Sequence, residues 1–169
     1  AQASSLMLID QETNELVYEI VHGSKRDQLH QFRMPMTVGI AGRVATTGEA
    51  IIVNDPARNP WFNRKVDERT GFLTRNILCV PLEIKGRIIG VLQVLNKRSD
   101  IGFTREDLDL MRTLASQAAI AIENARLYRD LQEERDRIIQ AQENVRRELA
   151  RDLHDGTTQL LSALSMNIE

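Results

Sequence analysis

The feature that most constrains this chain is a helical pattern that runs without Pro or Gly from residue 104 to residue 155. Apolar residues recur there at spacings of three and four, which places them along one face of an α-helix. They are Leu108, Met111, Leu114, Ala115, Ala118 and Ile122 in the first half, and Leu127, Leu131, Ile138, Ala141 and Val145 in the second. A small domain cannot bury so long a helix on all sides. We therefore expect its second half to pair with a second copy of the chain.

The second half of this helix fits a heptad seam, the apolar line along which two coiled helices meet. Glu134 occupies one core position of the seam. Beyond Val145 the apolar stripe continues in a shifted phase, and it is formed by Leu149, Leu153, Leu160 and Leu164. A shift of about four residues is a stutter, which locally unwinds a coiled coil. The pattern predicts a homodimer with a parallel coiled coil over residues 129–145. The alternative is a single exposed helix stabilised by salt bridges.

Composition and charge exclude several classes of protein. The 22 Lys and Arg residues nearly balance the 24 Asp and Glu residues, so net charge favours neither a nucleic acid nor a membrane surface as partner. No apolar stretch approaches the roughly 20 residues that span a bilayer, and no signal-peptide pattern opens the chain. The single cysteine, Cys79, excludes an intrachain disulfide framework and points to the reducing cytoplasm. His22 and His30 lack companions at metal-ligand spacing, so we expect no metal site.

The first half of the chain is predicted to form a β-sheet. Strands are predicted at residues 4–10, 15–22, 50–53, 76–84 and 87–95, and a helix at residues 39–47. Gly48 is placed to end that helix, and Lys85-Gly86 makes a tight hairpin turn. The last two strands are apolar at nearly every position, which implies a sheet covered on both faces. Because the chain opens almost directly on a strand, this start is consistent with a domain whose first helix has been cut away.

Two stretches of this region carry a family resemblance. The first is a strand signature made of Val80-Pro81-Leu82, Gly86, Ile89-Gly90-Val91-Leu92 and Asn96-Lys97. The second is the run WFNRKVDERTGF at residues 61–72, which leads into TRNILCVP at residues 74–81. Together they resemble the GAF domain, a small-molecule sensing module, and in particular the GAF domains of cyclic-nucleotide phosphodiesterases and cyanobacterial-type adenylyl cyclases. The resemblance implies an α+β fold over residues 1–128, with a central antiparallel sheet flanked by helices.

The same GAF domains carry a pattern of Asn-Lys, then Phe, then Asp-Glu. Asn96, Lys97, Phe103 and Asp107 match this pattern, whereas its final Glu is replaced by Leu108. In the family the Lys and the Asp pair with each other and do not touch the nucleotide. The resemblance therefore implies a salt bridge between Lys97 and Asp107 that joins a strand to the long helix.

A ligand pocket is expected beneath residues 61–72. Trp61 offers a ring on which a flat ligand can stack, and four polar residues can orient that ligand. They are Asp67, Thr70, Asn76 and Gln93. The resemblance to phosphodiesterase GAF domains makes a purine cyclic nucleotide the candidate ligand. The alternative is that Trp61, Phe62 and Phe72 only anchor the loop over the sheet.

Near the C-terminus the chain places His154 beside Asp155 on the helical stretch, with Gln159 one turn further on. A neutral imidazole is a good phosphoryl acceptor, and its ordinary pKa keeps much of it neutral in a cell. An adjacent carboxylate can take the proton lost on attack or hold the ring in its reactive tautomer. Asp155 and Gln159 are four residues apart and so share one helix face, where Gln can hold a water. The alternative is that His154 is an ordinary polar residue of an amphipathic helix.

The run around His154 resembles the phosphoacceptor helix of two-component sensor histidine kinases, in the class of the nitrate sensors and the membrane-fluidity sensor. The matching residues are Arg147, Ala150, Arg151, Leu153, His154, Asp155, Gln159 and Leu160. The resemblance implies that His154 is the phosphoacceptor, that Asp155 is the base and that Gln159 supports dephosphorylation of the response regulator. The family often has an apolar residue and a Gly where this chain has Thr157 and Thr158.

These patterns together predict the sensory and dimerisation region of a cytoplasmic sensor histidine kinase. Its parts are a GAF domain at residues 1–128, a coiled-coil linker at residues 129–145 and the start of the phosphoacceptor domain at residues 146–169. The full-length kinase would use ATP and Mg²⁺ and would pass its phosphoryl group to a response regulator. No ATP-binding motif lies within this chain, so we expect no kinase activity from it alone. The alternatives are a cyclic-nucleotide-binding GAF dimer without kinase chemistry and a ligand-free dimerisation domain.

Overall fold

The structure is a computed structural model that describes residues 1–24, 29 and 31–166, without the side chains of residue 69 and of residues 150–166. The chain divides into two units, Ala1–Ile122 and Glu123–Glu169, and each is described by itself. No helix in the described part of the chain is long and apolar enough to cross a membrane.

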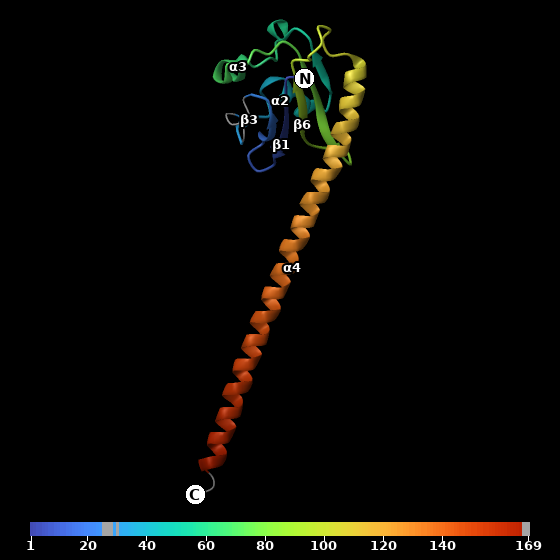
Figure 1. The fold of residues 1–169 in the computed structure, drawn as a ribbon. Coiled ribbons are helices and arrows are strands. Elements are labelled where there is room, and N and C mark those ends of the chain that lie inside the picture. The colour runs from blue at the N-terminus through green and yellow to red at the C-terminus, as the bar shows by residue number, and fades with distance from the viewer. Residues whose placement is uncertain (25–28, 30, 167–169) are drawn as a thin grey trace. The chain divides into compact units, whose positions relative to one another are not determined.

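The first unit is built on one antiparallel sheet of six strands in the order β3-β2-β1-β6-β5-β4 (Figure 1). The strands are β1 (Ala3–Asp10), β2 (Glu15–His22), β3 (Arg33–Pro35), β4 (Ile51–Val53), β5 (Ile77–Ile84) and β6 (Arg87–Leu95). The predicted central antiparallel sheet is therefore confirmed. The short edge strand β3 was not predicted, because its three residues carry no alternation and end in a proline.

The helices of the first unit lie on both faces of this sheet. They include α2 (Gly39–Thr47), α3 (Arg64–Thr70), a 3₁₀ turn η1 (Pro56–Arg58) and the beginning of α4 (Arg105–Met166). Helix α2 ends as predicted at Gly48, which has φ +73° and whose N–H donates to the carbonyl oxygen of Val44. Helix α4 is the predicted long helix, whereas its pairing in a coiled coil remains a prediction.

Two separate apolar cores hold the helices on the sheet. Under α2 the buried side chains include Met7, Leu16, Tyr18, Val44, Cys79 and Val91. On the opposite face, the start of α4 buries Met111, Ala115 and Ala119 against Leu78, Val80 and Leu82. Strands β5 and β6 are thus covered on both faces, as their continuous apolar sequence predicted. Cys79 is fully buried, and this burial raises the pKa of its thiol, so it belongs to the core and is not a reactive cysteine.

The start of α4 is fixed by side chains on both sides of the loop that precedes it. Asp107 accepts hydrogen bonds from the backbone N–H of Thr104, at 2.8 Å, and from Nζ of Lys97. The Thr104 hydroxyl in turn accepts from the N–H of Asp107, which completes a reciprocal cap. The side-chain amide of Asn54 donates to the backbone carbonyl oxygen of Phe103 and accepts from the backbone N–H of Phe103. The predicted Lys97–Asp107 salt bridge is therefore present.

This salt bridge gives stability a dependence on pH. The hydrogen bond from Lys97 is the main cause that holds the pKa of Asp107 below its ordinary value. A carboxyl group with a lowered pKa in the folded state stabilises the fold above its unfolded pKa, and this contribution is lost as the pH falls through the folded pKa. We expect Asp107→Asn to lower the free energy of unfolding by about 1 kcal/mol at pH 7. Urea unfolding at pH 7 and at pH 3 measures the difference in the free energy of unfolding between the wild type and this variant. This difference should be smaller at pH 3.

The matched control for this prediction is Asp109→Asn, which removes an exposed carboxylate from the same end of α4. An equal loss of stability in both variants would show that the charge of the helix end, and not the contact with Lys97, is responsible. A difference between wild type and Asp107→Asn that stays constant with pH would also contradict the interpretation.

Candidate functional site

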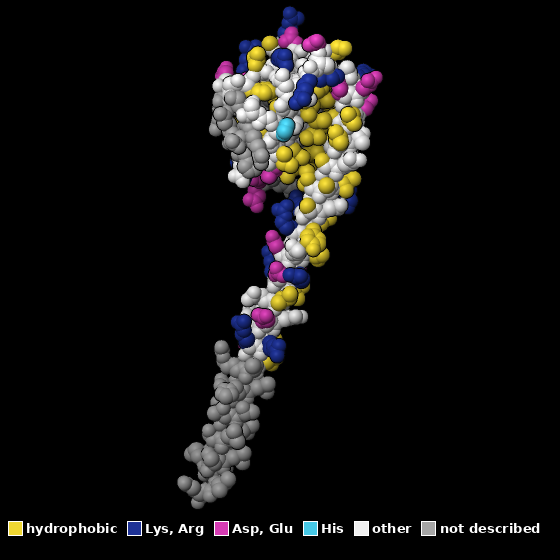
Figure 2. Space-filling model, viewed as in Figure 1, with side chains coloured by type: hydrophobic (Ala, Val, Ile, Leu, Met, Phe, Trp, Pro, Cys, Tyr) yellow, Lys and Arg dark blue, Asp and Glu magenta, His cyan; other side chains and the backbone are white. Residues whose placement is uncertain are grey.

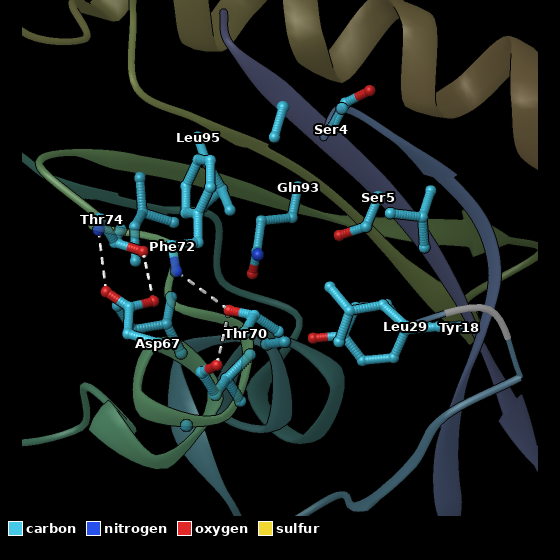
Figure 3. A pocket seen from close by; sticks show the side chains of 18 of the residues that line it. Ser4, Ser5, Tyr18, Leu29, Asp67, Thr70, Phe72, Thr74, Gln93 and Leu95 are labelled. Atoms are coloured by element: carbon cyan, nitrogen blue, oxygen red, sulfur yellow. Dashed lines mark hydrogen bonds between the residues drawn. The ribbon is translucent and has the colours of Figure 1, made fainter. Parts of the chain in front are cut away.

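A cavity lies over the sheet face that carries α2 and α3 (Figure 3). Its empty space amounts to about 780 Å³ when the open solvent at its mouth is included. Strands β1, β2 and β6 form its floor, and α2, α3 and the segment after α3 form its walls. Its lining is largely apolar and includes Val21, Met34, Phe62, Ile77 and Leu95. The cavity is therefore suited to a flat, largely apolar molecule that has a few polar groups.

Three of the five pocket residues expected from the sequence line this cavity. Asp67 and Thr70 reach it from α3, and Gln93 reaches it from β6. Trp61 and Asn76 are not among the lining residues. The Trp61 ring is 44% exposed and stacks against the guanidinium of Arg43, 4.0 Å from its ring centre. The Asn76 side chain instead accepts a hydrogen bond from the N–H of Lys97 at 2.8 Å, at the end of β6.

Asp67 and Thr70 already have hydrogen-bond partners within the protein (Figure 3). The two carboxylate oxygens of Asp67 accept from the backbone N–H and the hydroxyl of Thr74, at 2.8 and 2.7 Å. The Thr70 hydroxyl donates to the carbonyl oxygen of Val66 and accepts from the N–H of Phe72. These bonds hold the segment after α3 in place as a cavity wall. The main role of Asp67 and Thr70 in the free protein is therefore to shape the cavity.

Two hydroxyl groups that the sequence did not single out point into the cavity, from Ser5 on β1 and Tyr18 on β2 (Figure 3). Both residues are more than nine-tenths buried. The Ser5 hydroxyl has no hydrogen-bond partner within the described part of the chain. Burial raises the pKa of Tyr18 to about 12, so its hydroxyl remains a hydrogen-bond donor throughout the neutral range. Period-two alternation does not reveal Ser5, because apolar residues lie on both faces of β1.

The N-terminus of α2 lies at another part of the cavity wall, where Gly39, Ile40 and Ala41 are lining residues. The first backbone hydrogen bond of this helix runs from the N–H of Gly42 to the carbonyl oxygen of Val38, at 3.2 Å. The three preceding N–H groups have no partner in the described residues, and Val38 supplies no side-chain cap. No acidic residue lies in the first turn of α2, so the helix itself carries no carboxylate that would offset the partial positive charge of this end.

The described lining contains no Lys or Arg, and Asp67 is its one carboxylate. The lining also includes His22, so a phosphate or carboxylate group in the cavity would find its partners at the N–H groups at the start of α2 or at the imidazole of His22. Neutral polar groups of a ligand would find the hydroxyls of Ser5 and Tyr18 and the amide of Gln93. The site thus presents one region for an anion and another for an uncharged hydrogen-bonding edge.

The chain belongs to the GAF domain family, because the family model for the GAF domain matches residues 1–123. A probable 3′,5′-cyclic phosphodiesterase, pde-5, of Caenorhabditis elegans is 35% identical over 137 residues, which cover 76% of this chain and 19% of the relative. The dual 3′,5′-cyclic-AMP and -GMP phosphodiesterase 11 of Drosophila melanogaster is 34% identical over 122 residues, or 72% of this chain and 8% of the relative. The chain therefore spans about a fifth or less of these relatives.

Solved structures show the same fold. The GAF domain of a phosphoenolpyruvate-protein phosphotransferase from Coxiella burnetii superposes with a TM-score of 0.68 at 25% identity, covering 76% of this chain and 75% of that chain. The GAF-B domain of DevS from Mycobacterium smegmatis gives a TM-score of 0.62 at 21% identity, covering 78% of this chain and 86% of that chain. The antiparallel sheet flanked by helices is thus the GAF fold.

Proposed function

We propose that the GAF domain of this chain is a sensor that binds a cyclic nucleotide in the cavity between the sheet, α2 and α3. The observation that carries this proposal is the pairing of two features in one cavity. The uncapped start of α2 at Gly39 suits an anion, and the unpaired hydroxyl of Ser5 shows that the cavity also contains a buried polar group without a partner. The cyclic-nucleotide phosphodiesterases among the relatives support the same ligand class.

The chemistry of a cyclic nucleotide matches the charge distribution of this site. Its cyclic phosphate carries one negative charge, which the N–H groups of Gly39, Ile40 and Ala41 can bind without a Lys or Arg side chain. Its base is flat and mostly apolar, which suits walls made of side chains such as Phe62 and Leu95. The edge of the base carries donors and acceptors that hydroxyl and amide groups can satisfy.

The anion site can be tested by giving α2 a cap of its own. In Val38→Asp, the new carboxylate occupies the N-cap position, where it can accept from the free N–H groups and repel a phosphate. We expect cyclic AMP and cyclic GMP to bind Val38→Asp at least about tenfold more weakly than the wild type, which corresponds to about 1.4 kcal/mol. Isothermal titration calorimetry measures the affinity.

The matched control for this experiment is Val38→Asn, which supplies a cap of the same shape without a charge. It should bind more tightly than Val38→Asp if the phosphate lies at the start of α2. Equal affinities of the two variants would contradict the anion site. Absence of any heat with wild-type protein at ligand concentrations up to about 1 mM would contradict cyclic-nucleotide sensing.

Dimerisation through α4 is the proposed way in which the second unit takes part in signalling. The seam residues Leu127, Leu131, Ile138 and Val145 are half or more exposed in the single chain. Figure 2 shows hydrophobic side chains at intervals along this helix, between charged ones. A second copy of the same helix, aligned in parallel, would cover this seam along its whole length.

Ile138 and its neighbour Ile139 offer a matched test of the seam, because only Ile138 falls on the heptad positions. The exposed fractions of the two side chains are similar, at 50% and 46%. We expect Ile138→Asp to weaken dimerisation by at least about tenfold and Ile139→Asp to change it little, because only the first places a charge between two helices. Sedimentation equilibrium at micromolar concentration measures both. A monomeric wild-type chain, or equal effects of the two substitutions, would contradict the seam.

A second candidate function for the whole protein is that of a sensor histidine kinase. It is favoured by the sequence around His154 together with the unbroken backbone of α4 through Met166. The side chains of His154, Asp155 and Gln159 lie outside the described residues, so their roles as phosphoacceptor, base and phosphatase residue remain proposals. ATP, Mg²⁺ and a response regulator would be partners of the full-length protein in this case.

Acid-labile labelling of the full-length protein with ATP tests this second function. We expect His154→Gln to abolish labelling, because it removes the nucleophilic ring nitrogen, and Asp155→Asn to slow it by about 10²-fold. Gln159→Ala should chiefly impair dephosphorylation of the response regulator. Asp152→Asn removes a carboxylate two residues before His154 in the sequence and serves as the control. Labelling that persists in His154→Gln would rule out this phosphoacceptor.

A further inference from the structure

A glutamate lies where the seam of α4 calls for an apolar residue. Glu134 falls between the seam residues Leu131 and Ile138, at a core position of the heptad. Its carboxylate lies 3.6 Å from the guanidinium of Arg137 on the same helix, and both side chains are largely exposed, so this ion pair contributes little. In a dimer, two such carboxylates would face each other at this layer. A charge that loses water without gaining a close positive partner is costly, so the layer needs a cation from the partner helix.

The heptad places a suitable cation beside Glu134. With Leu131 at position a and Glu134 at position d, Asp130 falls on position g and Arg135 on position e. In a parallel coiled coil, a g residue lies beside the e residue of the next heptad on the other helix, so Asp130 lies beside the partner's Arg135. The hole that receives a d side chain is bordered by an e residue of the partner helix. The partner's Arg135 therefore lies beside Glu134 as well.

Asp130 and Arg135 are both available to a partner in the single chain. Asp130 is exposed and has no ion pair within the described part of the chain. The guanidinium of Arg135 donates from Nε and Nη2 to one carboxylate oxygen of its neighbour Asp136, at 3.1 and 2.7 Å. The side chains of Arg135 and Asp136 are 67% and 65% exposed. An ion pair with this exposure is weak, so Arg135 can exchange it for contacts with a partner at little cost.

We propose that Arg135 of each copy binds Asp130 and Glu134 of the other copy, and that this group of three residues, the seam charge cluster, fixes the register and the parallel direction of the dimer. The inference rests on the proposed dimerisation of α4, because the partner is a second copy of this chain. By symmetry the cluster occurs twice, once on each side of the seam. Each Glu134 then has a positive partner from the other helix where that helix excludes water.

Other alignments of the two helices lose these contacts. A slip by one heptad sets Asp130 beside Gln142 or Tyr128 of the other copy, and it brings Arg137 of one helix against Arg135 of the other. In an antiparallel pair, e positions face e positions, so an alignment about the same layer brings the two Arg135 side chains together. Like charges that meet in this way disfavour the wrong alignment. The apolar residues of the seam repeat with the heptad and discriminate less between these alignments.

Reversal of charge tests the cluster. Asp130→Arg and Arg135→Asp each replace attraction by repulsion on both sides of the seam, so each should weaken dimerisation by at least about tenfold. The double variant restores opposite charges at the two positions and also places an arginine one helical turn before Glu134. It should dimerise at least about fivefold more tightly than either single variant. Sedimentation equilibrium of the whole chain measures the dissociation constants, and the differences should shrink near 1 M salt, where the screening length is about 3 Å.

The matched controls are Asp136→Arg and Arg129→Asp, which make the same two changes of charge at f positions. These positions lie on the side of the helix away from the seam, so we expect changes in the dissociation constant of less than about threefold.

The direction and register are measured separately by cross-linking. Ala141→Cys places a thiol at the core position d that follows Glu134, where the two thiols of a parallel dimer in register face each other. With oxidised glutathione this variant should form an interchain disulfide. Gln140→Cys, at the outward position c, should form much less. The natural Cys79 does not interfere, because it is buried.

The outcomes separate this inference from the dimer itself. A wild-type chain that is monomeric at micromolar concentration overturns both. A dimer that responds equally to the cluster substitutions and to the f-position controls overturns the cluster alone. A double variant that is as weak as the single variants also overturns the cluster. A dimer in which Ala141→Cys cross-links no better than Gln140→Cys overturns the parallel register that the cluster is proposed to fix.

Discussion

The pairing of β6 with both β1 and β5 is the constraint on which the rest of the domain depends. Strand β6 lies in the middle of the sheet and joins the N-terminal hairpin to the hairpin near residue 85. Strands β6 and β1 lie so close together at Gly90 that a Cβ atom there would lie 2.2 Å from the carbonyl oxygen of Met7. The same pairing sets Ser5 beside Gln93, so the register that builds the sheet also builds the floor of the cavity.

Polar groups around the cavity fall into two kinds with different physical roles. Asp67 and Thr70 are fully engaged with neighbouring backbone and side-chain groups, so they hold the wall in place before any ligand arrives. Ser5, Tyr18 and Gln93 line the floor, and the Ser5 hydroxyl has no hydrogen-bond partner within the described part of the chain. If a ligand binds in this cavity as proposed, the fixed wall means that little conformational entropy of the protein is lost on binding.

At the start of α2 the partial positive charge comes from backbone N–H groups and not from a Lys or Arg side chain. The start of α2 presents N–H groups that no side chain caps, and the described lining contains no Lys or Arg. A helix end binds an anion through fixed dipoles, which do not have to be desolvated in the way that a buried ammonium group does. The lack of a Lys or Arg in the described lining is therefore compatible with the proposed phosphate-bearing ligand.

Sequence alone determined the elements whose signals are local. The hairpins, the end of α2 at Gly48 and the Lys97–Asp107 bridge could be predicted because each depends on a few residues near one another in the chain or on a family motif. Sequence could not bring Ser5 and Tyr18 into the cavity, since that outcome depends on how β1, β2 and β6 align across the sheet. Nor could it place Trp61 outside the cavity, where its ring contacts Arg43 of α2. A one-residue change of register would turn Ser5 to the opposite face, and only the packed tertiary structure fixes that register.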